Sequence, residues 1–305
     1  MSYVGVDIGG THTKIARVSL TERSLLARRQ FDTQACPDIG SFLTRLASEI
    51  RALSPGEELA GVGVGCPNAN FRTGQVSHAA NLPWKETVPL RAELARRLGC
   101  PAALDNDANV AALGEKYFGG ARQMEDFIVI TLGTGLGSGI FCNGQLVRGY
   151  SGMAGELGHL TFGNESRLSG YARKDAAETY LSASGLCRTY LQEMAREAVL
   201  PALPEVLSAD QITSWAESGE NRAKEALRQT GAWLGAFLAE LVLFSSPEAI
   251  FLTGGLTKAG EILLQPAREQ FKARLLPPFR DTVQLQVSVL PAGEAALLGA
   301  AALCA

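Results

Sequence analysis

The chain has 305 residues, of which 46% are hydrophobic and 19% charged, so a large buried core is expected and a disordered, collagen-like or coiled-coil protein is excluded. Its 28 Lys and Arg against 31 Asp and Glu give a net charge of −3, whereas a protein that binds nucleic acid usually carries a basic face. The N-terminus lacks a signal-like apolar run, and the longest apolar run, 295–305, is shorter than the ~20 residues of a membrane helix. We therefore expect a soluble cytoplasmic protein with no nucleic-acid or membrane partner.

Apolar residues along the chain alternate between the period of a strand and the period of a helix. The expected strands are 3–7, 12–18, 25–31, 59–65, 101–104, 127–132, 137–141, 145–147, 249–253 and 283–290. The expected helices are 38–53, 88–98, 108–118, one beginning at the capping box 208–211, about 221–244, 261–274 and 294–303. This order predicts an α/β protein with mixed sheets flanked by helices.

The strand, Gly-rich turn and strand of residues 3–18 have a counterpart at 127–141, which indicates two halves built on one plan. No Pro- or Ser-rich linker separates the halves, so we expect two domains around a shared cleft, with a boundary near 119–120. The predicted smaller domain comprises 1–118 plus about 291–305, because the last helix crosses back, and the larger one comprises 119–290.

Two Gly-rich turns follow predicted strands. Asp7 ends the first strand and precedes Gly9 and Gly10, which allow backbone amides to approach a phosphate, and its carboxylate suits Mg²⁺. The second turn, 132–139, contains Thr134 but lacks the Gly-Lys-Ser/Thr ending of a Walker A loop. Taken singly, the first turn is more typical of an ordinary hairpin, and the second also fits a tight hairpin.

Polar residues follow two further segments. Asp107, in the sequence Asp-Asn-Asp-Ala-Asn, begins a helix, where it fits either a helix cap or a general base. The sequence Gly-Glu-Leu-Gly-His at 155–159, together with Glu178, offers the acceptors and donors that a polyol needs. By itself, His159 is more typical of a structural histidine.

The order of these motifs, followed by Thr-Gly-Gly-Leu at 253–256, resembles the ROK family of sugar kinases and sugar-responsive repressors over residues 4–302. The resemblance implies the two-domain actin-like ATPase (ribonuclease H-like) fold and an ATP-dependent hexose kinase, most similar to a glucokinase. In that kinase Asp107 is the general base and Asp7 binds Mg²⁺. The implied sugar-binding residues are Asn81, Asn106, Asp107, Glu156, His159 and Glu178. The implied ATP-binding residues are Asp7, Gly9, Gly10, Thr11, Gly133, Thr134, Gly135, Gly254 and Gly255.

The sequence departs from the family in the segment that holds zinc in many members. The three positions of its cysteines are Ser169, Tyr171 and Ala176, none of which is a zinc ligand. We therefore expect no zinc, with His159 retained for the sugar. His12 also stands where many relatives have Lys or Asn.

Several alternatives remain open at this stage. The sugar could be glucose, fructose, mannose, allose, N-acetylmannosamine or a glucoside, and the donor ATP or polyphosphate. A repressor of the family would carry a helix-turn-helix before the first strand, and that strand begins here at residue 3. A non-catalytic sugar sensor is the other alternative. The resemblance also implies a homodimer.

Overall fold

The computed structural model describes residues 2–77, 79, 82–196, 206–291 and 293–304. Contacts divide the chain into two compact units, which are described separately here. The first comprises Met1–Glu125, Gly139–Gly155 and Ser288–Ala305, and the second Asp126–Ser138 and Glu156–Val287. The domain boundaries expected from the sequence stay a prediction.

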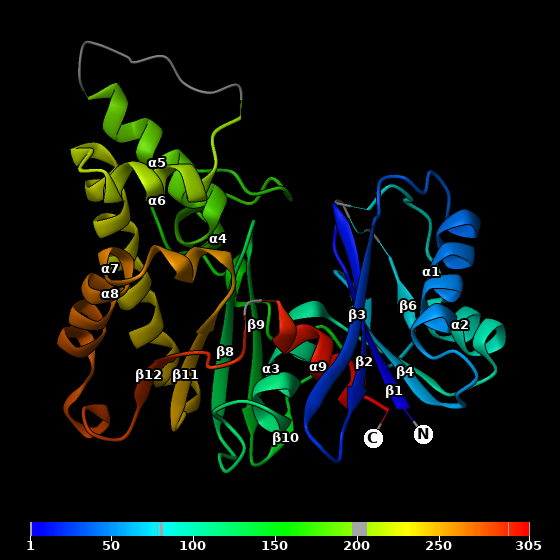
Figure 1. The fold of residues 1–305 in the computed structure, drawn as a ribbon. Helices are drawn as coiled ribbons and strands as arrows, with labels where there is room; N and C mark the ends of the chain where they lie inside the picture. Colours follow the sequence, from blue (N-terminus) through cyan, green and yellow to red (C-terminus); the bar gives the residue numbers. More distant parts are fainter. Residues whose placement is uncertain (1, 78, 80–81, 197–205, 292, 305) are drawn as a thin grey trace. The chain divides into compact units, whose positions relative to one another are not determined.

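The first unit contains a five-stranded sheet of order β3-β2-β1-β4-β7 (Figure 1). Strands β1, β2 and β3 are antiparallel, whereas β4 and β7 continue from β1 in parallel. The sheet strands are β1 (Ser2–Ile8), β2 (His12–Ser19), β3 (Ser24–Asp32), β4 (Leu59–Gly65) and β7 (Ala102–Asp105). The helices of this unit are α1 (Ile39–Leu53), α2 (Leu90–Leu98), α3 (Asp107–Tyr117) and α9 (Glu294–Ala302), and a small hairpin is formed by β5 (Ala69–Asn70) and β6 (Gln75–Val76).

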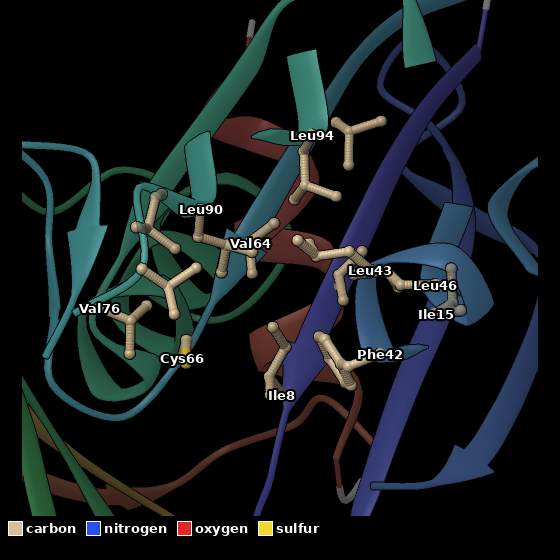
Figure 2. Close-up of a cluster of buried hydrophobic side chains, with 14 of the residues drawn as sticks. Ile8, Ile15, Phe42, Leu43, Leu46, Val64, Cys66, Val76, Leu90 and Leu94 are labelled. Atoms are coloured by element: carbon tan, nitrogen blue, oxygen red, sulfur yellow. The ribbon is translucent and has the colours of Figure 1, made fainter. Parts of the chain in front are cut away.

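One hydrophobic cluster joins the first unit's sheet to α1 and α2, as Figure 2 shows. Ile8 and Ile15 come from the sheet, Phe42 and Leu46 from α1, and Leu94 from α2, and all five are fully buried. Helix α1 presents this apolar face because its buried residues recur at the helical period, and Asp38 caps its start by accepting from the Ser41 amide at 2.9 Å.

Helix α9 packs directly on the backbone of the same sheet. A methyl group on Gly63 of β4 would lie 1.7 Å from the carbonyl oxygen of Ala300, so only glycine allows this approach. Ala16 and Val18 of β2 complete the contact with Leu297 and other residues of α9. Helix α9 therefore covers one face of the first unit's sheet.

The second sheet has the order β10-β9-β8-β11-β12, with β8 parallel to β11 and β11 parallel to β12. Its strands are β8 (Phe127–Leu132), β9 (Leu136–Cys142), β10 (Gln145–Leu146), β11 (Ala249–Thr253) and β12 (Gln284–Val287). The helices of the second unit are α4 (Glu178–Leu181), α5 (Ala183–Ala195), α6 (Ala209–Glu217), α7 (Asn221–Ser245) and α8 (Glu261–Arg274), with short 3-10 turns at Leu157–His159, Gly255–Ala259 and Pro277–Phe279.

Most elements lie where the periodicity predicts them, but the short strands β5 and β6 and the 3-10 turns were not predicted. Helices α4 and α5 were not predicted, although α5 buries Leu186, Tyr190 and Met194 at a spacing of four. Strand β12 is shorter than the expected 283–290, because only Gln284–Val287 pair with β11. No helix of the described residues is long and apolar enough to cross a membrane.

Candidate active site

The parallel strands of the first unit end side by side with polar residues. Asp7 of β1 pairs in register with Gly65 of β4, and Gly65 pairs with Asp105 of β7. Asn106 and Asp107 follow directly at the start of α3. Because ligands of open α/β sheets bind outside the carboxyl ends of the strands, this edge is the candidate site of the first unit.

The turn between β1 and β2 is held by its carbonyl groups. The carbonyl of Gly9 accepts from the Thr33 hydroxyl at 2.8 Å, that of Gly10 from the Gln34 side chain, and that of Thr11 from the Thr33 amide at 2.8 Å. In a planar trans peptide the C=O and the following N–H point in opposite directions. The amides of Gly10 and Thr11 therefore point away from Thr33 and Gln34, and neither has an acceptor among the described residues. Such a pair of amides suits an anion such as a phosphate.

Asp107 lies at the first position of α3. Its Oδ1 and the Oδ1 of the capping Asn106 both lie 2.9 Å from the Ala108 amide. Burial raises the pKa of the Asp107 carboxyl, and the hydrogen bond from Ala108 only partly opposes this. A carboxylate with a raised pKa accepts a proton more readily, as a general base must.

Asp105 supports this segment, a role that the sequence motif did not reveal. Its carboxylate is fully buried and accepts from Arg148 at 2.7 Å, from the Asn109 side chain at 2.8 Å and from the Asn106 amide at 2.8 Å. The Arg148 guanidinium in turn stacks over the Phe71 ring, 3.9 Å from its centroid. Asp105 thereby fixes the backbone that carries Asn106.

Asp7 is the second carboxylate of this edge. Burial and the nearby negative charge of Asp107 raise its pKa to about 6, against the opposing attraction of Lys14 on β2. A carboxylate whose ionisation is disfavoured by burial and by a neighbouring carboxylate fits a site that takes up a cation. Carboxylate oxygens are the type of ligand that Mg²⁺ prefers.

The second unit also presents its glycine turns at the carboxyl ends of parallel strands. Thr131 of β8 pairs with Thr253 of β11, so the turns Gly133–Gly135 and Gly254–Gly255 that follow them lie at one edge of the sheet. Gly254 has a positive φ of 105°, and its carbonyl accepts from the Thr257 hydroxyl at 2.8 Å. The structure thus brings together the phosphate and adenosine turns expected from the sequence.

His159 lies between two carboxylates of the second unit. Its Nε2 is 3.8 Å from Glu156 Oε2, and its Nδ1 is 3.7 Å from Glu178 Oε1. Both distances are longer than a hydrogen bond. The buried Nδ1 has no hydrogen-bond partner in the described part of the chain. The ring packs edge-on against Tyr171, at 5.3 Å between centroids. An imidazole and two carboxylates are side chains of the type that binds ligand hydroxyl groups.

The segment that replaces the zinc cysteines is held by protein contacts. The buried Arg167 guanidinium donates to Glu165 at 2.9 Å, to the Thr179 carbonyl at 3.1 Å and to Thr189 at 3.2 Å, and stacks 4.2 Å from the Tyr180 centroid. The Ser169 hydroxyl accepts from two backbone amides of its own loop at 3.3 Å. Within the described ranges, no group of three or more His, Cys, Asp or Glu is placed to hold a metal.

Asn81, the remaining expected sugar residue, lies outside the described residues. All the others fall at the two strand edges or around His159.

Known proteins are similar to this chain along almost its whole length. Residues 3–305 match the ROK family. A glucokinase of Streptomyces coelicolor is 34% identical over 98% of this chain and 96% of its own length, and a glucokinase of Halalkalibacterium halodurans is 33% identical over 97% and 93%. The structure of a ROK family glucokinase from Streptomyces griseus, in complex with glucose and AMPPNP, is similar with a TM-score of 0.84 and 32% identity, covering 99% of both chains. The fold is thus the two-domain actin-like fold of these kinases, and the chain belongs to the ROK family.

Proposed function

We propose that the protein transfers the γ-phosphoryl group of ATP to a hexose, with glucose and its 6-hydroxyl as the preferred acceptor. The observation that carries this is Asp107, a carboxylate with a raised pKa at the start of α3, beside Asp7 and the β1–β2 turn. The two ROK glucokinases at 33% and 34% identity and the glucokinase with glucose and AMPPNP support the choice of acceptor and donor.

In the proposed reaction the sugar oxygen attacks the γ-phosphorus, and the bond between that phosphorus and the β–γ bridging oxygen breaks, releasing ADP. Asp107 accepts the hydroxyl proton as the new bond forms. The amides of Gly10, Thr11 and the Gly133–Gly135 turn hold phosphate oxygens, so catalysis is mainly positioning and electrostatic stabilisation.

Sugar recognition is assigned to Asn106, Glu156, His159 and Glu178. The carboxylates of Glu156 and Glu178 accept hydrogen bonds from sugar hydroxyls, and the Asn106 amide and the half-buried His159 ring supply further donors or acceptors. The Gly254–Gly255 turn is assigned to adenosine.

Asp7 is proposed to hold Mg²⁺, directly or through water. Its carboxylate oxygens are ligands that suit Mg²⁺, and a bound cation would offset the unfavourable ionisation of the carboxyl group. When bound, Mg²⁺ neutralises charge on the phosphates. The expected homodimer and cytoplasmic location rest on the family resemblance and on the sequence, and they stay predictions.

The proposed function is tested by measuring ADP release from Mg·ATP with a panel of hexoses, N-acetylmannosamine and a glucoside, and by repeating the assay with polyphosphate as donor. We expect the highest kcat/KM with glucose and ATP. Strong turnover with a different sugar would correct the acceptor alone. Sugar binding without turnover of any sugar would replace the kinase with a sensor.

The expected absence of zinc gives a separate prediction. Because Arg167 and Ser169 hold the segment without thiolates, removing trace metals with EDTA and restoring Mg²⁺ should leave kcat and the melting temperature unchanged. The measurement is metal content by mass spectrometry, alongside the activity before and after chelation. One zinc per chain, lost together with activity, would contradict the prediction.

A further inference from the structure

The turn Gly133–Gly135 is attached by its carbonyls to the start of α5. The carbonyl of Gly133 accepts from the Ala183 amide at 2.9 Å, and that of Thr134 accepts from the Ser184 hydroxyl at 2.6 Å. Peptide planarity then turns the N–H groups of Thr134 and Gly135 away from α5. Neither amide has an acceptor among the residues that the structure describes. The start of α5 thus sets the direction of two free donors.

This arrangement has an independent counterpart in the first unit. There Thr33 and Gln34 engage the carbonyls of the β1–β2 turn and leave the amides of Gly10 and Thr11 free. The two turns therefore obtain paired donors by the same means, through carbonyls held by residues outside the turn. In the second unit the side chain that does this is Ser184.

Within the group formed by Ser182, Ser184 and the Thr134 carbonyl, the Ser184 hydroxyl has two alternative acceptors. Each serine hydroxyl has one proton to donate. The buried Ser182 donates to the Glu178 carbonyl at 2.6 Å and caps α5 by accepting from the Gly185 amide at 3.1 Å. The hydroxyls of Ser182 and Ser184 are 3.0 Å apart, so Ser184 can donate either to Ser182 or to the Thr134 carbonyl, but not to both.

The same cluster contacts the sugar-binding end of the unit. The backbone carbonyl of Glu178 accepts the hydrogen bond from the Ser182 hydroxyl. The Oε2 atom of the same residue lies 2.8 Å from the position that a methyl group on Gly135 would occupy. Its Oε1 faces His159. The Glu178 carboxylate thus lies beside Gly135, and the Glu178 backbone is joined to Ser182 and through it to Ser184.

We propose that Ser184 is a positioning residue, which orients the Gly135 amide toward the phosphate of the donor nucleotide and links that turn to Glu178. The proposal rests on the proposed kinase function for its kinetic consequence, but not for its consequence on nucleotide binding. Because one hydrogen bond to the turn is lost, Ser184→Ala should raise the KM for ATP about three- to tenfold, with little change in the KM for glucose.

Two readouts separate positioning from a general loss of structure. The Kd of Mg·AMPPNP, measured by calorimetry with and without glucose, should rise by the same factor in Ser184→Ala, and any tightening by glucose should shrink. Ser184→Thr keeps the hydroxyl and should restore both values. The matched control is Ser208→Ala, which removes the serine that caps α6 by accepting from the Gln211 amide at 3.2 Å.

Each outcome decides the proposal. A Kd for Mg·AMPPNP in Ser184→Ala equal to that of the wild type or raised only as much as in Ser208→Ala overturns it. A selective rise that Ser184→Thr reverses supports it. If the wild type phosphorylates no sugar, the proposed function fails, and the AMPPNP comparison still decides the role of Ser184.

Discussion

Replacing Asp107 with asparagine should lower kcat by a factor of about 10² to 10⁴, the range over which a positioned general base accelerates proton transfer. The amide keeps the size of the carboxylate and an oxygen that can accept from the Ala108 amide, so the start of α3 is preserved. The KM for the sugar should change little, because Asn106 and the residues around His159 remain. Steady-state kinetics with saturating ATP and glucose provide the measurement.

The matched control for this variant is Asp210→Asn. Asp210 is also a carboxylate in the first turn of a helix, α6, and it has no assigned part in the site. Its kcat should equal that of the wild type. An Asp107→Asn enzyme that retained more than about a tenth of the wild-type kcat would remove Asp107 from the role of base.

Replacing Asp7 with asparagine should abolish most of the activity and at the same time stabilise the fold. The pKa of Asp7 is raised from 3.8 to about 6, so its ionisation disfavours the folded state. At pH 7.5 the wild type carries this penalty in full, about 2 to 3 kcal/mol in the free energy of unfolding, and the neutral amide removes it. Urea unfolding of both proteins without nucleotide or Mg²⁺ measures the difference.

The sign of the pH dependence provides a stringent check. Below about pH 3 Asp7 is protonated in both the folded and the unfolded protein, so the advantage of Asp7→Asn should disappear there, grow between about pH 4 and pH 6 and level off above pH 6. Asp38→Asn is the control of opposite direction, since hydrogen bonds from Ser41 lower the pKa of Asp38 and favour its ionised form. Equal stabilities of wild type and Asp7→Asn at pH 7.5 would contradict the prediction.

The sequence predicted where in the fold the candidate residues lie when the signal is local along the chain. Asp7 and the glycines after it, Asp107 at a helix start, and the Gly133–Gly135 turn all lie where a strand ends, and both strand ends and helix starts have short-range signals. Their order along the chain indicated the family.

Supporting residues could not be predicted, because they come from distant segments. Arg148 pairs with Asp105 across 43 positions, and Ser184 reaches Thr134 across 50. Nothing near Ser184 in the sequence distinguishes it from the other serines that begin helices. Only the packing of α5 beside the turn assigns it a partner, and packing is a property of the whole fold.

The glycine-dependent contact between β4 and α9 also bears on how the protein is made. The first unit combines segments that lie far apart along the chain, because α9 at Glu294–Ala302 covers β1, β2 and β4. At translation rates of about 5 to 20 residues per second, some 10 to 30 s separate Glu125 from Ser288 at the ribosome. During that interval the apolar side chains of Ala16 and Val18 await their cover, so the nascent N-terminal half is the stage at which chaperones have the most to protect.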